Sequence, residues 1–75
     1  MLLTDLKKEQ KAFITDIKNE FNFIKRLTSL GIGINHQIEL KFKAPFNGPY
    51  YICTNNRQII MRKSDTKLIE VTLIN

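Results

Sequence analysis

The side chains with the most reactive chemistry in this 75-residue sequence are one histidine and one cysteine. His36 and Cys53 are 17 positions apart. Neither belongs to a Cys-x-x-Cys or His-x-x-x-His spacing, which would place two metal ligands together. A transition-metal ion would also need further nitrogen or carboxylate donors around an open position. The pattern therefore predicts no metal site, and we expect both residues to have ordinary structural positions.

Combinations of residues that could catalyse a reaction are also missing. A single histidine supports no Cys–His or Ser–His–Asp set, and the carboxylates are scattered along predicted strands and turns. Gly31-x-Gly33 lacks the third glycine and the preceding strand of a dinucleotide-binding fingerprint. Gly31 follows a predicted helix instead of opening one, so no helix N-terminus is available for a phosphate group. We expect no enzyme activity and no cofactor.

Aromatic side chains with basic neighbours are the remaining candidates for function, and they indicate binding. Phe46, Tyr50 and Tyr51 surround a proline-rich loop. Because Tyr50 and Tyr51 are successive residues of a predicted strand, at most one of them belongs to the core. Aromatic residues near basic ones are good anchors of protein interfaces. Together with Ile34 and Arg26 they form the predicted partner-binding set; the alternative is that Phe46 and one tyrosine simply cover the core.

The net charge of +5 results from twelve basic and seven acidic residues. The basic residues are dispersed, so a solvated basic surface is the simplest interpretation, while nucleic acid, acidic proteins and lipid surfaces stay open. No strand shows the several aromatic residues flanked by lysines that would favour base stacking. The sequence has no apolar run of about 18 residues, no signal-peptide core and no cysteine pair. We expect a cytoplasmic protein with no direct insertion into a membrane.

The first part of the chain predicts a strand followed by a helix. Residues 1–9 are a short polar lead-in, and Ala12–Ile17 is a strand with apolar residues on both faces, which indicates either a bulge or burial on both sides. Asn19 is the expected N-cap of a helix over residues 20–30, and Gly31 ends that helix in a left-handed conformation. The helix has one apolar stripe, formed by Phe23, Ile24, Leu27 and Leu30.

The rest of the chain predicts four short strands. In the first of them, Ile38, Leu40 and Phe42 alternate with charged residues, which predicts that these three are buried. A loop with Asn47-Gly48 follows it. The expected elements are a strand at Gln37–Lys43, a hairpin of Tyr50–Thr54 and Arg57–Arg62 turning at Asn55-Asn56, a helical turn at Ser64–Lys67 capped by Ser64, and a strand at Ile69–Leu73. Five short antiparallel strands favour a small, strongly bent barrel, because closure removes exposed edges.

In the order and spacing of these elements, the chain resembles the ferrous iron transport protein A family (FeoA-like). The matching positions run from Gln10 to Leu73 and comprise Ile14, Ile17, Arg26-Leu27, Leu30-Gly31-Ile32, Ile38, Leu40, Ala44-Pro45, Ile59–Arg62 and Leu68–Val71. Two turns depart from the family pattern, since Ile34-Asn35 replaces proline and glycine and Asn56 replaces a glycine. Asparagine adopts positive φ with little strain, so both turns are expected to form. The expected structural turn residues are Gly31, Asn35, Gly48 and Asn56.

The resemblance implies one SH3-like domain over residues 1–75: a mainly β, antiparallel barrel of about five strands, with one helix between strands 1 and 2. It also implies a cytoplasmic accessory protein of ferrous iron uptake that docks onto the cytosolic part of the ferrous iron transporter, a membrane protein with a GTP-binding domain. That docking would hold it at the inner face of the membrane, and weak self-association is open. The alternatives are a small nucleic-acid-binding barrel and a free-standing relative of the C-terminal domains of iron-dependent repressors. We expect neither a helix-turn-helix nor a dimerisation region, because about ten residues precede the first strand.

Overall fold

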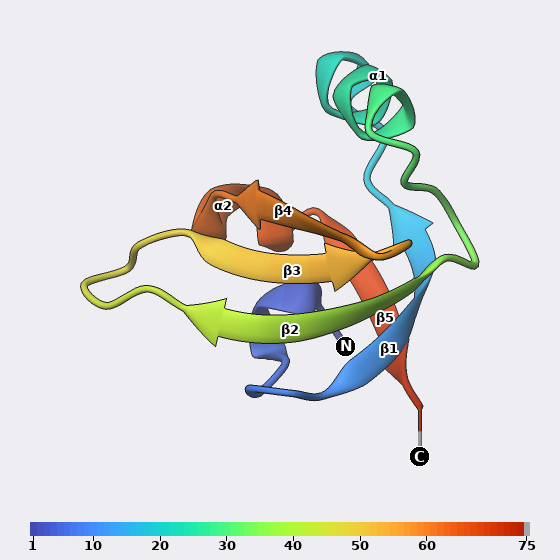
Figure 1. Cartoon of the computed structure of the whole chain (residues 1–75). Coiled ribbons are helices and arrows are strands. Elements are labelled where there is room, and N and C mark those ends of the chain that lie inside the picture. The colour runs from blue at the N-terminus through green and yellow to red at the C-terminus, as the bar shows by residue number, and fades with distance from the viewer. Residues whose placement is uncertain (75) are drawn as a thin grey trace.

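Short alternating segments of the chain form one antiparallel sheet with the strand order β4-β3-β2-β1-β5 (Figure 1). The computed structural model describes residues 1–74. Its elements are η1 (Leu3–Asp5), β1 (Lys11–Ile17), α1 (Phe21–Ser29), β2 (Gln37–Lys43), β3 (Tyr50–Thr54), β4 (Arg57–Met61), α2 (Lys63–Thr66) and β5 (Ile69–Leu73). The predicted bounds of β2, β3 and β5 are confirmed, and those of the other predicted elements agree to within one residue. The mainly β, SH3-like architecture with a helix between the first two strands is also confirmed.

The sheet is strongly bent but does not close into the predicted barrel. Its edge strands, β4 and β5, do not pair with each other within residues 1–74. The N-terminal segment protects the edge of β5 instead: Leu2 forms a bridge with Glu70, and the Val71 amide donates to the Met1 carbonyl at 2.7 Å. An unpaired edge strand invites contact with other chains, so the N-terminal segment protects β5 in place of the pairing that a closed barrel would have provided.

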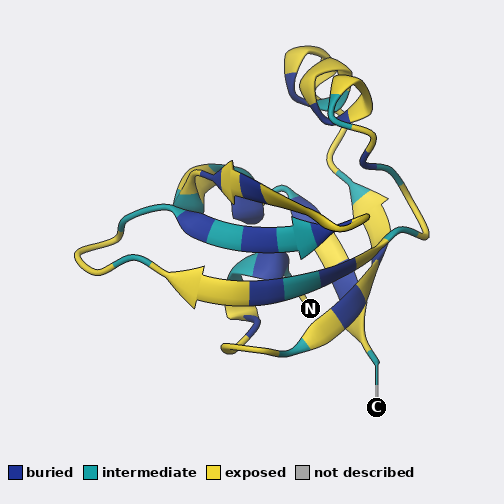
Figure 2. Ribbon diagram, viewed as in Figure 1, coloured by how far each residue is buried: buried dark blue, intermediate teal, exposed yellow. Residues whose placement is uncertain are grey.

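Residues 1–9, predicted as a lead-in, contribute to the core. Leu3 and Leu6 are 1% and 0% exposed. The 3₁₀ turn of η1 explains this burial, because residues three apart in such a turn lie on the same side. The same core contains Ala12, Ile14, Phe23, Leu27, Ile32, Ile38, Leu40, Tyr50, Ile52, Ile59, Met61, Ile69 and Val71. Figure 2 shows buried and exposed residues alternating along the strands that enclose this core.

Helix α1 stands at one end of the sheet, with most of its surface exposed (Figures 1 and 2). Phe23 and Leu27 of the predicted stripe are buried. The N-cap is Glu20, whose carboxylate accepts from the Asn22 amide at 3.1 Å, so the prediction of Asn19 was wrong. Gly31 ends the helix with φ +78°, as predicted.

The asparagine turns form as expected. Asn35, Asn55 and Asn56 have φ values of 72°, 50° and 62°, which are left-handed conformations that asparagine tolerates. The predicted bulge of β1 is confirmed as a register shift between Ile14 and Asp16. The cap of α2 was predicted wrongly, because its N-cap is the residue before Lys63 and no side chain bonds there.

Candidate functional site

The loop between β2 and β3 presents one aromatic side chain entirely to solvent. Phe46 is 98% exposed and has φ +59°, an unusual conformation for a bulky residue. Asn47, with the same φ, continues the left-handed turn, and the Ala44 amide donates to the Pro49 carbonyl at 2.9 Å to close the loop. These contacts hold the phenyl ring at the tip of the hairpin.

Gly48 has a different role from the one its Asn-Gly context indicates. The positive φ values of this loop fall on Phe46 and Asn47, not on the glycine. A Cβ atom on Gly48 would lie 2.7 Å from the Ala44 Cβ and 2.9 Å from the Pro45 carbonyl oxygen. Glycine is therefore required by the close approach of the two sides of the loop.

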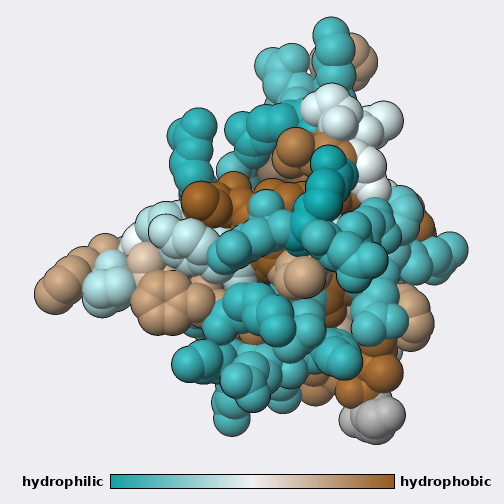
Figure 3. Space-filling view, viewed as in Figure 1, coloured by the Kyte–Doolittle hydropathy of each residue, from teal (hydrophilic) through white to brown (hydrophobic). Residues whose placement is uncertain are grey.

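Two exposed side chains and one half-buried tyrosine form a row across the outer face of β2, β3 and β4. Phe42 pairs with Tyr51, and Tyr51 pairs with Ile60. The rings of Phe42 and Tyr51 are tilted by 56°, with centroids 5.7 Å apart, as in favourable aromatic pairs. Phe42 is 47% and Ile60 61% exposed. We call the row, together with Phe46 at the tip of the same hairpin, the outer apolar surface; Figure 3 shows brown side chains exposed along this part of the molecule.

The exposure of Phe42 corrects the prediction that it is buried with Ile38 and Leu40. The register of β2 shifts between Leu40 and Phe42, so that Leu40 pairs with Ile52 while Phe42 pairs with Tyr51. One extra residue in β2 reverses the side of every side chain beyond it. Ile60 was also missed, although the burial of Ile59 and Met61 on either side requires it to point outward.

Of the two tyrosines, Tyr50 is the core residue, which confirms that at most one of them is buried. It is 4% exposed, and its hydroxyl lies 3.0 Å from the Thr4 Oγ1 and donates to the Thr4 carbonyl at 3.1 Å. The Lys43 Nζ lies 5.0 Å from its ring centroid. Tyr50 was predicted to bind a partner, but it supports the fold and exposes almost no surface. Tyr51 is half-buried in the outer row.

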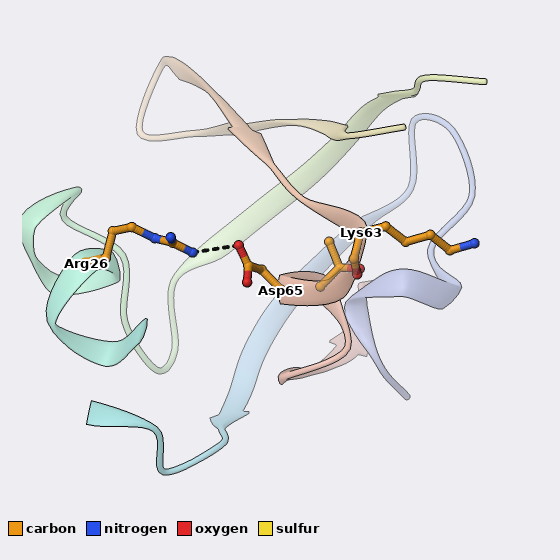
Figure 4. A network of polar contacts seen from close by, with 4 residues as sticks. Arg26, Lys63 and Asp65 are labelled. Carbon is orange, nitrogen blue, oxygen red and sulfur yellow. Dashed lines mark hydrogen bonds and ion pairs between the residues drawn. The ribbon is translucent and has the colours of Figure 1, made fainter. Parts of the chain in front are cut away.

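Ile34 lies away from this surface, whereas Arg26 borders it and lines one pocket together with Ile60. Arg26 extends from α1 to Asp65 of α2, where Nη2 and Oδ2 are 2.6 Å apart (Figure 4), and its guanidinium lies over the Phe23 ring. Ile34 is 54% exposed in the turn between α1 and β2. Figure 1 places α1 and this turn at the end of the molecule opposite the β2–β3 loop. The structure thus separates the predicted partner-binding set into two places.

His36 lies in the turn before β2, and Cys53 lies within β3. The His36 Nδ1 accepts from the Gly33 amide at 2.6 Å, which fixes the ring against its own turn. Cys53 pairs with Glu39 of β2, and Glu39 follows His36 by three residues. At the spacing of a strand, this separates Cys53 from His36 by about 10 Å. Glu39 is bound by Lys41 at 3.1 Å, and this hydrogen bond raises the pKa of Lys41. Within residues 1–74, no three His, Cys, Asp or Glu side chains gather as a metal site.

The same portion of the chain has no helix with the length and apolar character needed to cross a bilayer. The site that these residues form is a surface for contact with another molecule, and it lies on the paired strands β2, β3 and β4. Two strand ladders hold the outer row, and the hydrogen-bonded loop holds Phe46 beyond it.

Comparisons with known proteins identify relatives of this architecture. The sequence matches the family described as the FeoA domain over residues 1–73, which extends further toward the N-terminus than the expected Gln10. The solution structure of the FeoA protein from Chlorobium tepidum is similar, with 25% identity and a TM-score of 0.92 over 100% of this chain and 71% of that one. Iron(II) transport protein A from Clostridium thermocellum is 28% identical, with a TM-score of 0.92 over 99% of this chain and 46% of that one.

The fold also occurs within larger regulators. The metal-dependent transcriptional regulator MtsR has 20% identity and a TM-score of 0.87, and the match covers 99% of this chain but 34% of that protein. At this identity the likeness concerns the fold alone. No curated protein sequence matches this chain.

Proposed function

This chain belongs to the FeoA domain family, which is related to ferrous iron transport, and we propose that it is a cytoplasmic accessory protein of ferrous iron uptake. In this proposal it binds the cytosolic part of the ferrous iron transporter and lies at the inner face of the membrane through that contact. Its means of action is surface complementarity, with no chemical step and no cofactor.

The observation that carries the proposal is the outer apolar surface. Phe42 and Ile60 are about half exposed, they flank Tyr51, and Phe46 is fully exposed at the tip of the same hairpin. Contiguous exposed apolar side chains mark interaction sites, and aromatic anchors dominate the energy of protein interfaces. The hydrogen-bonded ladders of β2, β3 and β4 already fix the row, so a partner orders little of it on binding.

In this proposal the partner binds the outer apolar surface, and neither Arg26 at its border nor Ile34 at the far end is an anchor. Arg26 is already engaged with Asp65 and stacked over Phe23. Ile34 stands in the turn between α1 and β2, at the other end of the sheet from the Phe42–Tyr51 pair. Ile34 is useful as a reporter of the alternative, in which the partner binds the turn between α1 and β2.

The proposal is tested by an NMR titration of the isotope-labelled chain with the cytosolic domain of the transporter from the same organism. We expect shifts at the backbone amides of residues 42–44, 46, 51 and 60, and weaker binding of Phe46→Ala. Replacing Phe46 leaves the core intact, because its ring has no buried contact. Shifts confined to α1 and residues 31–36 would move the docking site to the other end, and no shifts would refute docking onto this domain.

A second candidate function is nucleic-acid binding. The observation in its favour is the Phe42–Tyr51 pair with Lys41 beside it on β2, which resembles a stacking platform next to a cation. Contacts with several phosphates would make affinity fall about tenfold or more between 50 and 200 mM salt. A fluorescence anisotropy titration of a single-stranded oligonucleotide at these two salt concentrations distinguishes the two functions.

A further inference from the structure

A cavity of about 620 Å³ lies between the β2–β3 loop and the segment that follows β4. The cavity is open to solvent, so a ligand bound there would stay partly exposed. One side consists of Asn47, Gly48 and Pro49, and the other of Arg62, Lys63, Ser64 and Lys67. No residue of the outer apolar surface or of the predicted partner-binding set lines this cavity.

The cavity is lined by three cations and no carboxylate. Arg62, Lys63 and Lys67 form no ion pair with any residue between 1 and 74. Asp65 is the acidic residue closest to them in sequence, but it is turned toward Arg26 on α1. Figure 4 shows Lys63 and Asp65 extending from opposite sides of α2. The positive charge of the cavity is therefore not compensated by its own walls.

The polar side chains that line the cavity include several hydrogen-bond donors. The Lys63 Nζ donates to the Asn47 Oδ1 at 2.8 Å, which fixes the ammonium between the two sides and leaves the Asn47 amide NH₂ as a donor. The Lys63 ammonium keeps two further protons, and Ser64 adds a hydroxyl. Donors of this kind around a concentrated positive charge match the acceptor oxygens of a phosphate group.

We propose that this cavity binds a phosphate group, either free or in the headgroup of an anionic phospholipid. The proposal is independent of docking onto a transporter. Phe46 distinguishes the two sources, because it precedes Asn47 and is 98% exposed. Beside a lipid headgroup its ring would enter the interfacial layer of the bilayer, whereas it has no contact to make with free phosphate.

The experiment has two arms on the full chain. In the first, inorganic phosphate is titrated into the isotope-labelled protein, and we expect saturable shifts confined to residues 47–49 and 62–67. In the second, the protein is sedimented with vesicles of phosphatidylglycerol and phosphatidylcholine, or of phosphatidylcholine alone. A lipid site predicts binding to the anionic vesicles only, with a severalfold loss in Phe46→Ala, which leaves the phosphate titration unchanged.

The test variant is Lys63→Gln/Lys67→Gln. Its matched control is Lys18→Gln/Lys25→Gln, which removes the same charge from exposed positions at the α1 end. Each lysine near an anionic surface contributes about fivefold to affinity, so the test variant is expected to lose tenfold or more and the control less than threefold. The amide spectrum of each variant first establishes that it is folded.

Three results would overturn the proposal. The first is the absence of localised shifts with phosphate together with equal sedimentation on both kinds of vesicle. The second is an equal loss in the test and control variants, which would indicate a response to net charge only. In the third, a single-stranded oligonucleotide shifts residues 47–49 and 62–67 while neither phosphate nor vesicles do, and the cavity is then a nucleic-acid contact.

Discussion

Replacing Leu3 with alanine tests whether the N-terminal segment is part of the fold. The Leu3 side chain is 1% exposed and packs in the core, whereas the adjacent Leu2 is only half-buried. Truncating a buried leucine removes its transfer free energy and leaves a cavity, at a cost of about 2–5 kcal/mol. A domain of this size has a free energy of unfolding of roughly 4–11 kcal/mol, so Leu3→Ala removes a large part of it.

Thermal and urea unfolding followed by circular dichroism measure this loss. For a domain this small, each 1 kcal/mol lowers Tm by roughly 4–8 °C, so we expect Leu3→Ala to lower Tm by more than about 10 °C. The matched control is Leu2→Ala, whose backbone bridge to Glu70 is unaffected by the change of side chain. We expect it to cost less than about 1 kcal/mol. If the two variants lose equal and small amounts, residues 1–9 are a lead-in and the described packing is wrong.

Two further predictions concern residues whose roles the structure changed. Tyr50→Phe keeps the buried ring but removes the hydroxyl that bonds to Thr4, so we expect a loss of about 1 kcal/mol in urea unfolding, against about 3–5 kcal/mol for Tyr50→Ala. An equal loss in both variants would contradict the burial of the ring. Gly48→Ala places a Cβ 2.7 Å from the Ala44 Cβ and should cost about 1–3 kcal/mol, whereas an unchanged Tm would show that the loop is open.

Local sequence patterns predict most of the elements because their causes are local. The bounds of β2 and β5 follow from alternation within each strand. Gly31 and Asn35 take positive φ for reasons intrinsic to glycine and asparagine. Each of these features depends on a residue and its immediate neighbours, which the sequence displays directly.

The features that were missed depend on contacts distant in sequence or on a change of register. Leu3 and Leu6 are buried because the N-terminal segment pairs with β5 about seventy residues later. The same pairing covers the edge that barrel closure was expected to remove. Phe42 faces outward because one extra residue in β2 reverses its side, and an alternating pattern gives no sign of that reversal.

The two ends of the molecule provide the most direct test of docking through the outer apolar surface. Ile60 lies within this surface and is 61% exposed, while Ile34 is 54% exposed at the opposite end. Ile60→Asp and Ile34→Asp therefore make the same chemical change at similar exposure. Isothermal titration calorimetry with the cytosolic domain of the transporter gives Kd for each variant.

A carboxylate at Ile60 would be buried without a partner in the proposed interface, so we expect Kd to rise by about thirtyfold or more. The Ile34→Asp variant should bind within about threefold of the unmodified chain. Equal affinities of the two variants, or a greater loss in Ile34→Asp, would contradict docking through the outer apolar surface.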